Sequence, residues 1–255
     1  MTHLGIKSAY FIKYMRFHHS FQAQTLREGF KNKPWAGLIP LLPFSVKPTT
    51  KKDIQWMRKF WHVGMIVVVC YLYAKVFQTR QQALLGWLVL GGPFLLLDIL
   101  RTKIRPLNLF IISLFSPLMR KRELCSPSST TPFLLSSFLV MALFPKSIAI
   151  VSMLCLAFGD VAACMIGLRF GKDKIFQKKS LQGSLACFVV CFLIILAFLI
   201  AHQVSSNTLV VIALIGGMAA ALGELIAVKP LDDNFTIPVV TASILYPTLL
   251  LLSNF

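Results

Sequence analysis

Eight apolar runs make up most of the chain after residue 62, and they constrain its fold more than any other feature. They lie at residues 63–79, 83–100, 106–118, 131–145, 147–168, 183–201, 208–228 and 236–253. A helix needs about 20 residues, and no fewer than about 17, to cross a hydrocarbon core. Apolar residues make up 56% of the 255 positions and the mean hydropathy is +0.74, which is unlike a soluble globular protein. The sequence therefore predicts an all-α, polytopic transmembrane helical bundle.

The positions of the basic residues predict the topology. The run at 106–118 is too short to cross and has basic clusters on both sides, so we expect a re-entrant or interfacial helix there. The remaining seven spans then put nearly every basic segment on one side: 1–60, 101–105, 120–122, 169–179 and Lys229. The other side keeps Arg80, Lys146 and His202. This positive-inside pattern predicts that the N-terminus and the active site are cytoplasmic. We expect the host to be a bacterial inner membrane or an endoplasmic reticulum membrane.

The net charge of +17 has the same explanation. Its basic residues lie in short segments between apolar runs, which favours an anionic membrane surface over nucleic acid as the partner. We expect two regions. Residues 1–60 form a basic cytoplasmic segment, either a helix on the membrane surface or a poorly ordered tail, and residues 61–255 form the transmembrane catalytic domain.

One carboxylate lies inside an apolar run. Asp160 precedes Leu168, where the run reaches a basic loop, by eight residues, or about 12 Å of helix. An ionised group at this depth needs a partner or a wet cavity. Gly159, Ala163 and Gly167 form a ridge of small residues beside it, which lets a helix or a ligand approach. Asp160 is either a functional carboxylate reached through a cleft or part of a packing ridge, paired with a neighbouring lysine.

A second acidic group surrounds the start of the last run. Glu224 ends the preceding run, and Asp232, Asp233 and Asn234 come before Pro238, which suits the first turn of a helix. Helix capping explains one of these acidic residues well, but not two. The predicted topology places the four carboxylates near one membrane face. Hard oxygen ligands favour magnesium, so the candidate metal ligands are Asp160, Glu224, Asp232 and Asp233.

Basic residues near the same face are candidates for binding phosphate. Lys179 and Ser180 lie where the next run begins, with Gly183 in its first turn, and a helix N-terminus beside an ammonium group favours an anion. Two further groups are candidates: Arg58, Lys59 and His62 before the first run, and Arg169 and Lys172 in the loop after Asp160. The alternative is that these residues only anchor the topology.

Magnesium-binding carboxylates, phosphate-binding lysines and access from lipid together indicate phosphoryl or nucleotidyl transfer to a membrane lipid. In such a reaction a protein mainly positions the groups and neutralises charge. The sequence has no Walker-type or kinase-type glycine loop, which excludes the soluble nucleotide-binding folds that carry those loops.

Four motifs resemble one family. They are R-K-x-x-H at 58–62, G-D-x-x-A-x-x-x-G-x-R-x-G at 159–171, K-S-x-x-G-S at 179–184, and G-E followed by D-D-N-x-x-x-P at 223–238. In order and spacing they resemble the integral-membrane CTP-dependent lipid kinases: dolichol kinase, phytol and farnesol kinases, and the yeast-type diacylglycerol kinase. These are related to phosphatidate cytidylyltransferases. The resemblance covers about 180 of the 255 residues.

The resemblance implies transfer of the γ-phosphate of CTP, or of another nucleotide, to a lipid hydroxyl with magnesium or calcium. It implies that Asp160 and residues 232–234 hold metal and phosphates, that Lys179 and Ser180 contact the triphosphate, and that Glu224 supports them. Asp160, Asp233 and Lys179 are then the candidate catalytic residues. The chain departs from the family pattern at 120–132, which leaves the contribution of Arg122 and Glu123 open.

Two other functions stay open. A phosphatidate cytidylyltransferase would use the same site to attack the α-phosphorus, although the signature of that family is absent as such. An ion- or proton-coupled transporter would use Asp160 and Glu224 as relay carboxylates, but it should carry polar residues through the full membrane thickness. The sequence leaves the lipid open among polyprenol or dolichol, phytol and diacylglycerol. It also leaves the oligomeric state open.

Overall fold

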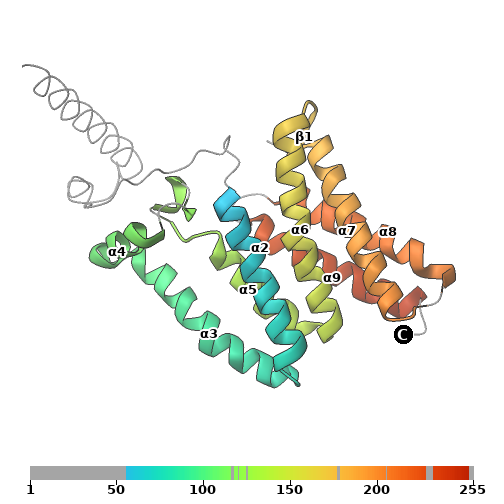
Figure 1. Ribbon diagram of the computed structural model, residues 1–255, viewed down its shortest axis with the longest axis horizontal. Helices are drawn as coiled ribbons and strands as arrows, with labels where there is room; N and C mark the ends of the chain where they lie inside the picture. The colour runs from blue at the N-terminus through green and yellow to red at the C-terminus, as the bar shows by residue number, and fades with distance from the viewer. Residues whose placement is uncertain are drawn as a thin grey trace, which may run out of the picture. The chain divides into compact units, whose positions relative to one another are not determined.

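The computed structural model describes residues 56–115, 118–119, 121–124, 126–176, 179–204, 206–227 and 232–252 (Figure 1). The chain divides into two compact units, and each is described by itself. Unit 1 comprises residues 1–58 and 97–128, and unit 2 comprises residues 59–96 and 129–255. The predicted N-terminal segment lies almost entirely outside the described residues, so its conformation stays a prediction.

Helices make up nearly all of the described chain. In order they are α2 (Trp56–Tyr71) with a π-helical turn at Leu72–Val76, α3 (Arg80–Arg101), α4 (Arg105–Phe115), a 3-10 turn at Lys121–Leu124, α5 (Thr130–Leu143), α6 (Lys146–Phe170), α7 (Leu181–Ala201), α8 (Ser206–Leu225) and α9 (Asp233–Leu252). The predicted all-α polytopic class is confirmed.

Six of these helices are long and apolar enough to cross a membrane: α2 with its π-helical turn, α3, α6, α7, α8 and α9. The predicted short helix at 106–118 is α4, whose 11 residues extend only about 17 Å. The predicted span at 131–145 is α5, and its 14 residues fall short of the usual crossing length. The structure therefore supplies six of the seven predicted spans at full length.

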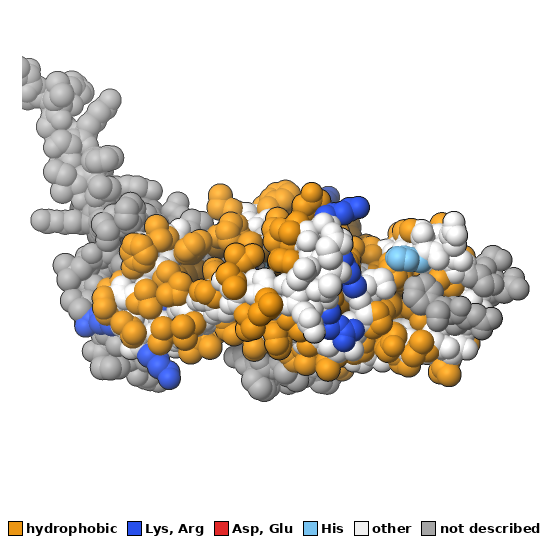
Figure 2. All heavy atoms as spheres, turned by 90° about the horizontal axis from the view of Figure 1, so that it is seen from below, with side chains coloured by type: hydrophobic (Ala, Val, Ile, Leu, Met, Phe, Trp, Pro, Cys, Tyr) orange, Lys and Arg blue, Asp and Glu red, His pale blue; other side chains and the backbone are white. Residues whose placement is uncertain are grey.

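Helix α6 lies at the centre of unit 2. It packs against α7 and α9, while α8 packs against α7 and α9, and α5 packs against α9 (Figure 1). Leucine, valine, isoleucine and phenylalanine side chains remain exposed along the outer helices, and hydrophobic side chains cover most of the described surface on the face drawn in Figure 2. This outward apolar surface is what a lipid environment requires.

Two local features differ from the sequence-based expectation. The basic loop after α6 contains a short antiparallel hairpin, β1 (Lys174–Phe176) with β2 (Lys179–Ser180). Helix α9 begins at Asp233, so Pro238 lies inside the helix and not in its first turn. Proline has no N–H, which removes the usual donor to the Asn234 carbonyl. The Ser136 hydroxyl donates to that carbonyl instead, at 2.9 Å.

A buried polar network organises unit 1. Arg101 is 1% exposed and donates to Asp98 Oδ1 at 2.7 Å, as expected for residues at i and i+3. It also donates to Asn108 Oδ1 and to the carbonyls of Glu123 and Ser126. These contacts all satisfy the buried guanidinium group of Arg101. Together they connect the last turn of α3 to α4 and to the segment after α4.

Candidate active site

The first part of the candidate site is an ion pair between α2 and α6. Lys59 Nζ lies 2.6 Å from Asp160 Oδ2, and the two side chains are 13% and 15% exposed. These two largely buried charges compensate each other, because either charge alone would lose its hydration and have no partner. The sequence left open whether Asp160 pairs with a lysine, and the structure identifies that lysine as Lys59.

The second part joins three elements of unit 2 around Lys179. Lys179 Nζ, on β2, lies 2.5 Å from Glu224 Oε1 on α8 and 3.2 Å from Asp233 Oδ2 at the start of α9. The Ser184 hydroxyl on α7 donates to Glu224 Oε2 at 2.9 Å. Both oxygens of Glu224 are therefore engaged, and one ammonium group connects two carboxylates from different helices.

The two parts interact electrostatically. Burial alone would lower the pKa of Lys179, but the carboxylates of Asp233, Glu224 and Asp160 outweigh it and hold this pKa above its ordinary value. Lys179 is therefore a cation throughout the neutral range. We define Lys59, Lys179, Asp160, Glu224 and Asp233 as the charge cluster. Its two ammonium groups and three carboxylates give a formal charge of −1.

Close crossing of α6 and α7 brings the start of α7 to the cluster. A Cβ added to Gly183 would lie 2.8 Å from the Ala163 carbonyl oxygen and 3.3 Å from Gly167 Cα, so no side chain fits there. A Cβ added to Gly159 would lie 2.6 Å from Cys191 Sγ. The predicted ridge of small residues thus packs directly on α7.

Ser180 caps α7, because its hydroxyl accepts from the Gly183 N–H at 3.2 Å. This bond explains the Ser of the K-S-x-x-G-S motif by helix capping, and the close approach of Ala163 and Gly167 explains the Gly. The cap sets the direction of the first turn of α7, and Lys179 immediately precedes it. Ser180 therefore helps to position Lys179.

The remaining predicted residues lie around the cluster. Arg169 and Lys172 are exposed, and the Arg169 guanidinium lies 5.4 Å from the centre of the Phe170 ring. His62 and Asn234 contact α5 and its N-cap: the His62 ring is edge-on to Phe133, and Asn234 Nδ2 donates to the Ser129 carbonyl at 2.9 Å.

Asp232 and Arg58 have other described contacts. The Asp232 carbonyl accepts from the Phe235 and Thr236 N–H groups, which starts α9. Arg58 belongs to unit 1, where its Nη2 lies 3.6 Å from Glu123 Oε1. This pair gives Glu123, whose role the sequence left open, a described partner.

The carboxylates of the charge cluster suit a hard cation, but in this structure each of them is paired with a lysine. Among the described residues, no three His, Cys, Asp or Glu side chains converge in the manner of a metal site. Carboxylate oxygens are the ligands that magnesium prefers. Here Asp160, Glu224 and Asp233 each contact an ammonium group, so a divalent ion would have to compete with it. The metal site stays a prediction.

One contributor to the cluster was missed at the sequence level. Ser184 is the last residue of the K-S-x-x-G-S motif, but a serine one turn into an apolar run gives no sign of its partner. Its bond to Glu224 depends on α7 lying beside α8, which the local sequence does not reveal.

The fold and the cluster together define a class of protein: a polytopic α-helical membrane protein with a polar site in which lysines and carboxylates alternate. Comparison with curated proteins gives the family. The chain is 32% identical to CTP-dependent diacylglycerol kinase 1 of Eremothecium gossypii, over 76% of this chain and 66% of that protein. It is 28% identical to CTP-dependent diacylglycerol kinase 1 of Saccharomyces cerevisiae, over 76% and 72%.

A third relative, the probable phytol kinase 1, chloroplastic, of Glycine max, is 31% identical over 40% of this chain and 36% of its own. The chain is thus a homologue of the CTP-dependent lipid kinases, which confirms the resemblance predicted from the four motifs. The alignments span about two thirds of the length of the two fungal relatives. No family model matches the chain, and no solved structure matches it.

Proposed function

We propose that this protein is a membrane lipid kinase that transfers the γ-phosphate of CTP to the hydroxyl of a lipid alcohol. The observation that carries the proposal is the charge cluster, because residues from all four motifs that resemble this family meet there or next to it. The names of the fungal relatives favour diacylglycerol as the lipid, and the plant relative keeps phytol as an alternative. A polyprenol is the third candidate.

In this proposal the lysines exchange partners when the nucleotide binds. Lys59 and Lys179 turn from carboxylates to phosphate oxygens, with which ammonium groups form strong charge-assisted bonds. The exchange frees Asp160, Glu224 and Asp233, with Asp232 beside them, to hold magnesium or calcium. A bound divalent ion would neutralise charge on the β- and γ-phosphates.

The chemistry needs a proton acceptor and a fixed line of attack. The lipid oxygen forms a bond to the γ-phosphorus, the bond from that phosphorus to the bridging oxygen breaks, and CDP leaves. The hydroxyl proton passes to a carboxylate of the cluster, Asp160 or Asp233. Holding the two reactants in line supplies much of the rate enhancement in phosphoryl transfer.

We further propose that the cluster faces the cytoplasm, where CTP is available. The cluster lies near the end of α6 that leads into the β1–β2 hairpin and its basic residues. A cytoplasmic position for that hairpin agrees with the positive-inside pattern, as does a cytoplasmic N-terminus.

Purified protein incubated with γ-labelled CTP tests the proposal. The panel contains diacylglycerol, phytol, farnesol and a polyprenol, and each is assayed with and without EDTA followed by excess magnesium or calcium. We expect label in one class of lipid alcohol and recovery with a divalent ion. A parallel assay with α-labelled CTP and phosphatidate detects nucleotidyl transfer. Label only in that assay supports the cytidylyltransferase, and no label in either contradicts both enzyme functions.

A further inference from the structure

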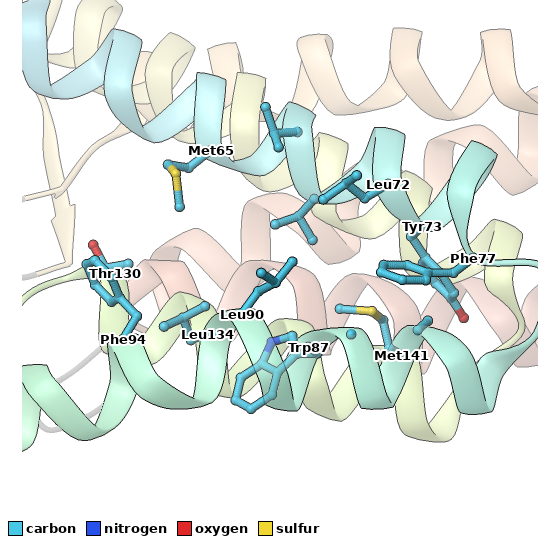
Figure 3. A pocket seen from close by; sticks show the side chains of 15 residues that line it. Met65, Leu72, Tyr73, Phe77, Trp87, Leu90, Phe94, Thr130, Leu134 and Met141 are labelled. Atoms are coloured by element: carbon cyan, nitrogen blue, oxygen red, sulfur yellow. The ribbon is translucent and has the colours of Figure 1, made fainter.

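An apolar groove in unit 2 lies between α2, α3 and α5, and it has no role in the site described above. It encloses about 170 Å³. In Figure 3, Met65 and Thr130 lie toward one end, Tyr73 and Met141 toward the other, and Trp87 and Leu90 between them. We propose that this groove holds the first part of a hydrocarbon chain of the lipid substrate. This inference rests on the proposed kinase function.

One stripe of α2 leads from the groove toward the charge cluster. His62, Met65, Val69 and Leu72 follow one another at spacings of three, four and three residues, which places them on one stripe of the helix. Three of them line the groove, and Lys59 lies one turn before His62. A lipid that lies along this stripe therefore has its polar end toward Lys59 and Asp160.

Contacts of α5 independently indicate the same end of the groove as the one toward the charge cluster. Thr130 lines the groove at the end where α5 begins, and its neighbour Ser129 accepts a hydrogen bond from Asn234 at 2.9 Å. Asn234 directly follows Asp233 of the cluster. Two different helices thus lead from the same end of the groove to the charge cluster, α2 to Asp160 and α5 to Asp233.

The walls suit a hydrocarbon and the open side faces lipid. The Trp87 indole N–H is directed to Ser137 Oγ at 3.0 Å, so the tryptophan presents only its apolar ring to the groove. Val68 and Leu90 line the groove and are 54% and 63% exposed, so the groove opens on the apolar surface.

The enclosed volume limits what is recognised. An apolar cavity of about 150 Å³ takes a ligand of the size of benzene. The groove therefore encloses a short segment of one chain, and the rest of the chain continues into the bilayer. Shape near the headgroup should matter for selection, and total chain length much less once the groove is filled.

A pair of matched variants tests this inference. Leu90→Trp fills the groove, whereas Val89→Trp introduces the same side chain next to it, at a position that is 70% exposed and does not line the groove. Each variant is assayed with dioleoylglycerol and with soluble diacetylglycerol, whose two-carbon chains are too short to fill the groove. Geranylgeraniol and the five-carbon alcohol 3-methylbut-2-en-1-ol are assayed in parallel. We expect Leu90→Trp to lose about tenfold or more in kcat/KM for the long-chain substrate, and about twofold or less for the short one.

A second variant keeps the test informative if Leu90→Trp fails to fold. Met141→Ala enlarges the far end of the groove, so it should improve kcat/KM for substrates with a methyl branch on the chain relative to straight ones. Misfolding would lower both rates together. Equal losses in Leu90→Trp and Val89→Trp, or no change of preference in Met141→Ala, would overturn the inference while leaving the kinase function intact.

Photolabelling separates this inference from the proposed function. A diacylglycerol with a diazirine on one chain should label peptides that contain Met65, Trp87 or Met141. Unlabelled diacylglycerol should displace it, and phosphatidylcholine should not. Equal displacement by both lipids identifies ordinary boundary lipid and overturns the inference. Selective labelling without any phosphorylation in the kinase assay supports the groove and contradicts the kinase function.

Discussion

Each residue of the charge cluster is held in place by an opposite charge. Lys59 has one carboxylate partner and Lys179 has two. Substitution of Asp160 or of either lysine therefore leaves a largely buried charge without its ion pair. A loss of activity in a single variant therefore has two possible causes, chemistry and stability. Double variants that remove both charges of an ion pair separate the effect on chemistry from the effect on stability.

Asp160→Asn should reduce phosphorylation by about a hundredfold or more, as expected when a group that acts directly on the reactants is lost. It should also destabilise the protein by about 3 kcal/mol, because Lys59 loses its partner. The double variant Lys59→Met with Asp160→Asn should regain the stability but not the activity, measured by thermal unfolding in detergent and by transfer of label from γ-labelled CTP. Asp173→Asn, at an exposed carboxylate, is the control. A double variant with normal turnover would return Asp160 to a packing role.

Glu224→Gln should move the alkaline limit of activity to lower pH. In the native protein, burial lowers the pKa of Lys179, but its three carboxylate neighbours raise it by more than burial lowers it. The ammonium group therefore persists to a higher pH than an ordinary lysine. Replacing one carboxylate by an amide lowers that pKa, and the cation is lost earlier as the pH rises. The measurement is kcat/KM for CTP between about pH 8 and pH 11.5, a window that reaches above the ordinary lysine pKa. Ser184→Ala keeps both charges, and an identical profile in the two variants would contradict the electrostatic explanation.

At the scale of elements, the site depends on how closely α6 and α7 cross. The contact consists of backbone against backbone at Ala163, Gly167 and Gly183, so no flexible side chain can move aside. The crossing places β2 and the start of α7 beside the end of α6. A small displacement of α7 would therefore change the position of Lys179 directly.

Gly183→Ala should destabilise the protein by about 1–3 kcal/mol through overpacking and reduce the kinase rate together with it. Gly92→Ala is the matched control, because a Cβ at Gly92 of α3 meets nothing within 4 Å. Thermal unfolding in detergent and the labelled-CTP assay measure the two effects. If Gly183→Ala is as stable and as active as Gly92→Ala, the crossing is looser than described and Gly183 is not required for it.

At the scale of the whole molecule, the proposed orientation can be measured directly. Lys174→Cys in the β1–β2 hairpin and His202→Cys after α7 place thiols at opposite ends of one crossing helix. In sealed vesicles whose cytoplasmic side faces out, an impermeant maleimide should label the first and not the second. The described native cysteines give little background, since all but the half-buried Cys164 are buried, and Cys125→Ser removes the one outside the described residues. The reverse labelling pattern would refute a cytoplasmic site.

The sequence predicted the architecture because a membrane imposes a simple rule on helix length and polarity. It also identified every member of the charge cluster, since each is a charged residue in or next to an apolar run. It did not predict which lysine pairs with which carboxylate, or the Ser184 contact, because both depend on the lateral order of helices. It placed the start of α9 too late, since Pro238 suggested a first turn while Ser136 makes a proline tolerable further in.

The fluorescence of Trp87 should report what occupies the groove. Its indole ring forms part of the groove wall and its N–H is directed away to Ser137, so its emission depends on what fills the groove. A lipid alcohol with bromine atoms on its chain would quench that emission on entry, and the difference from a Trp87→Phe protein isolates the signal. Occupancy of the groove could thus be followed in real time without nucleotide and without turnover.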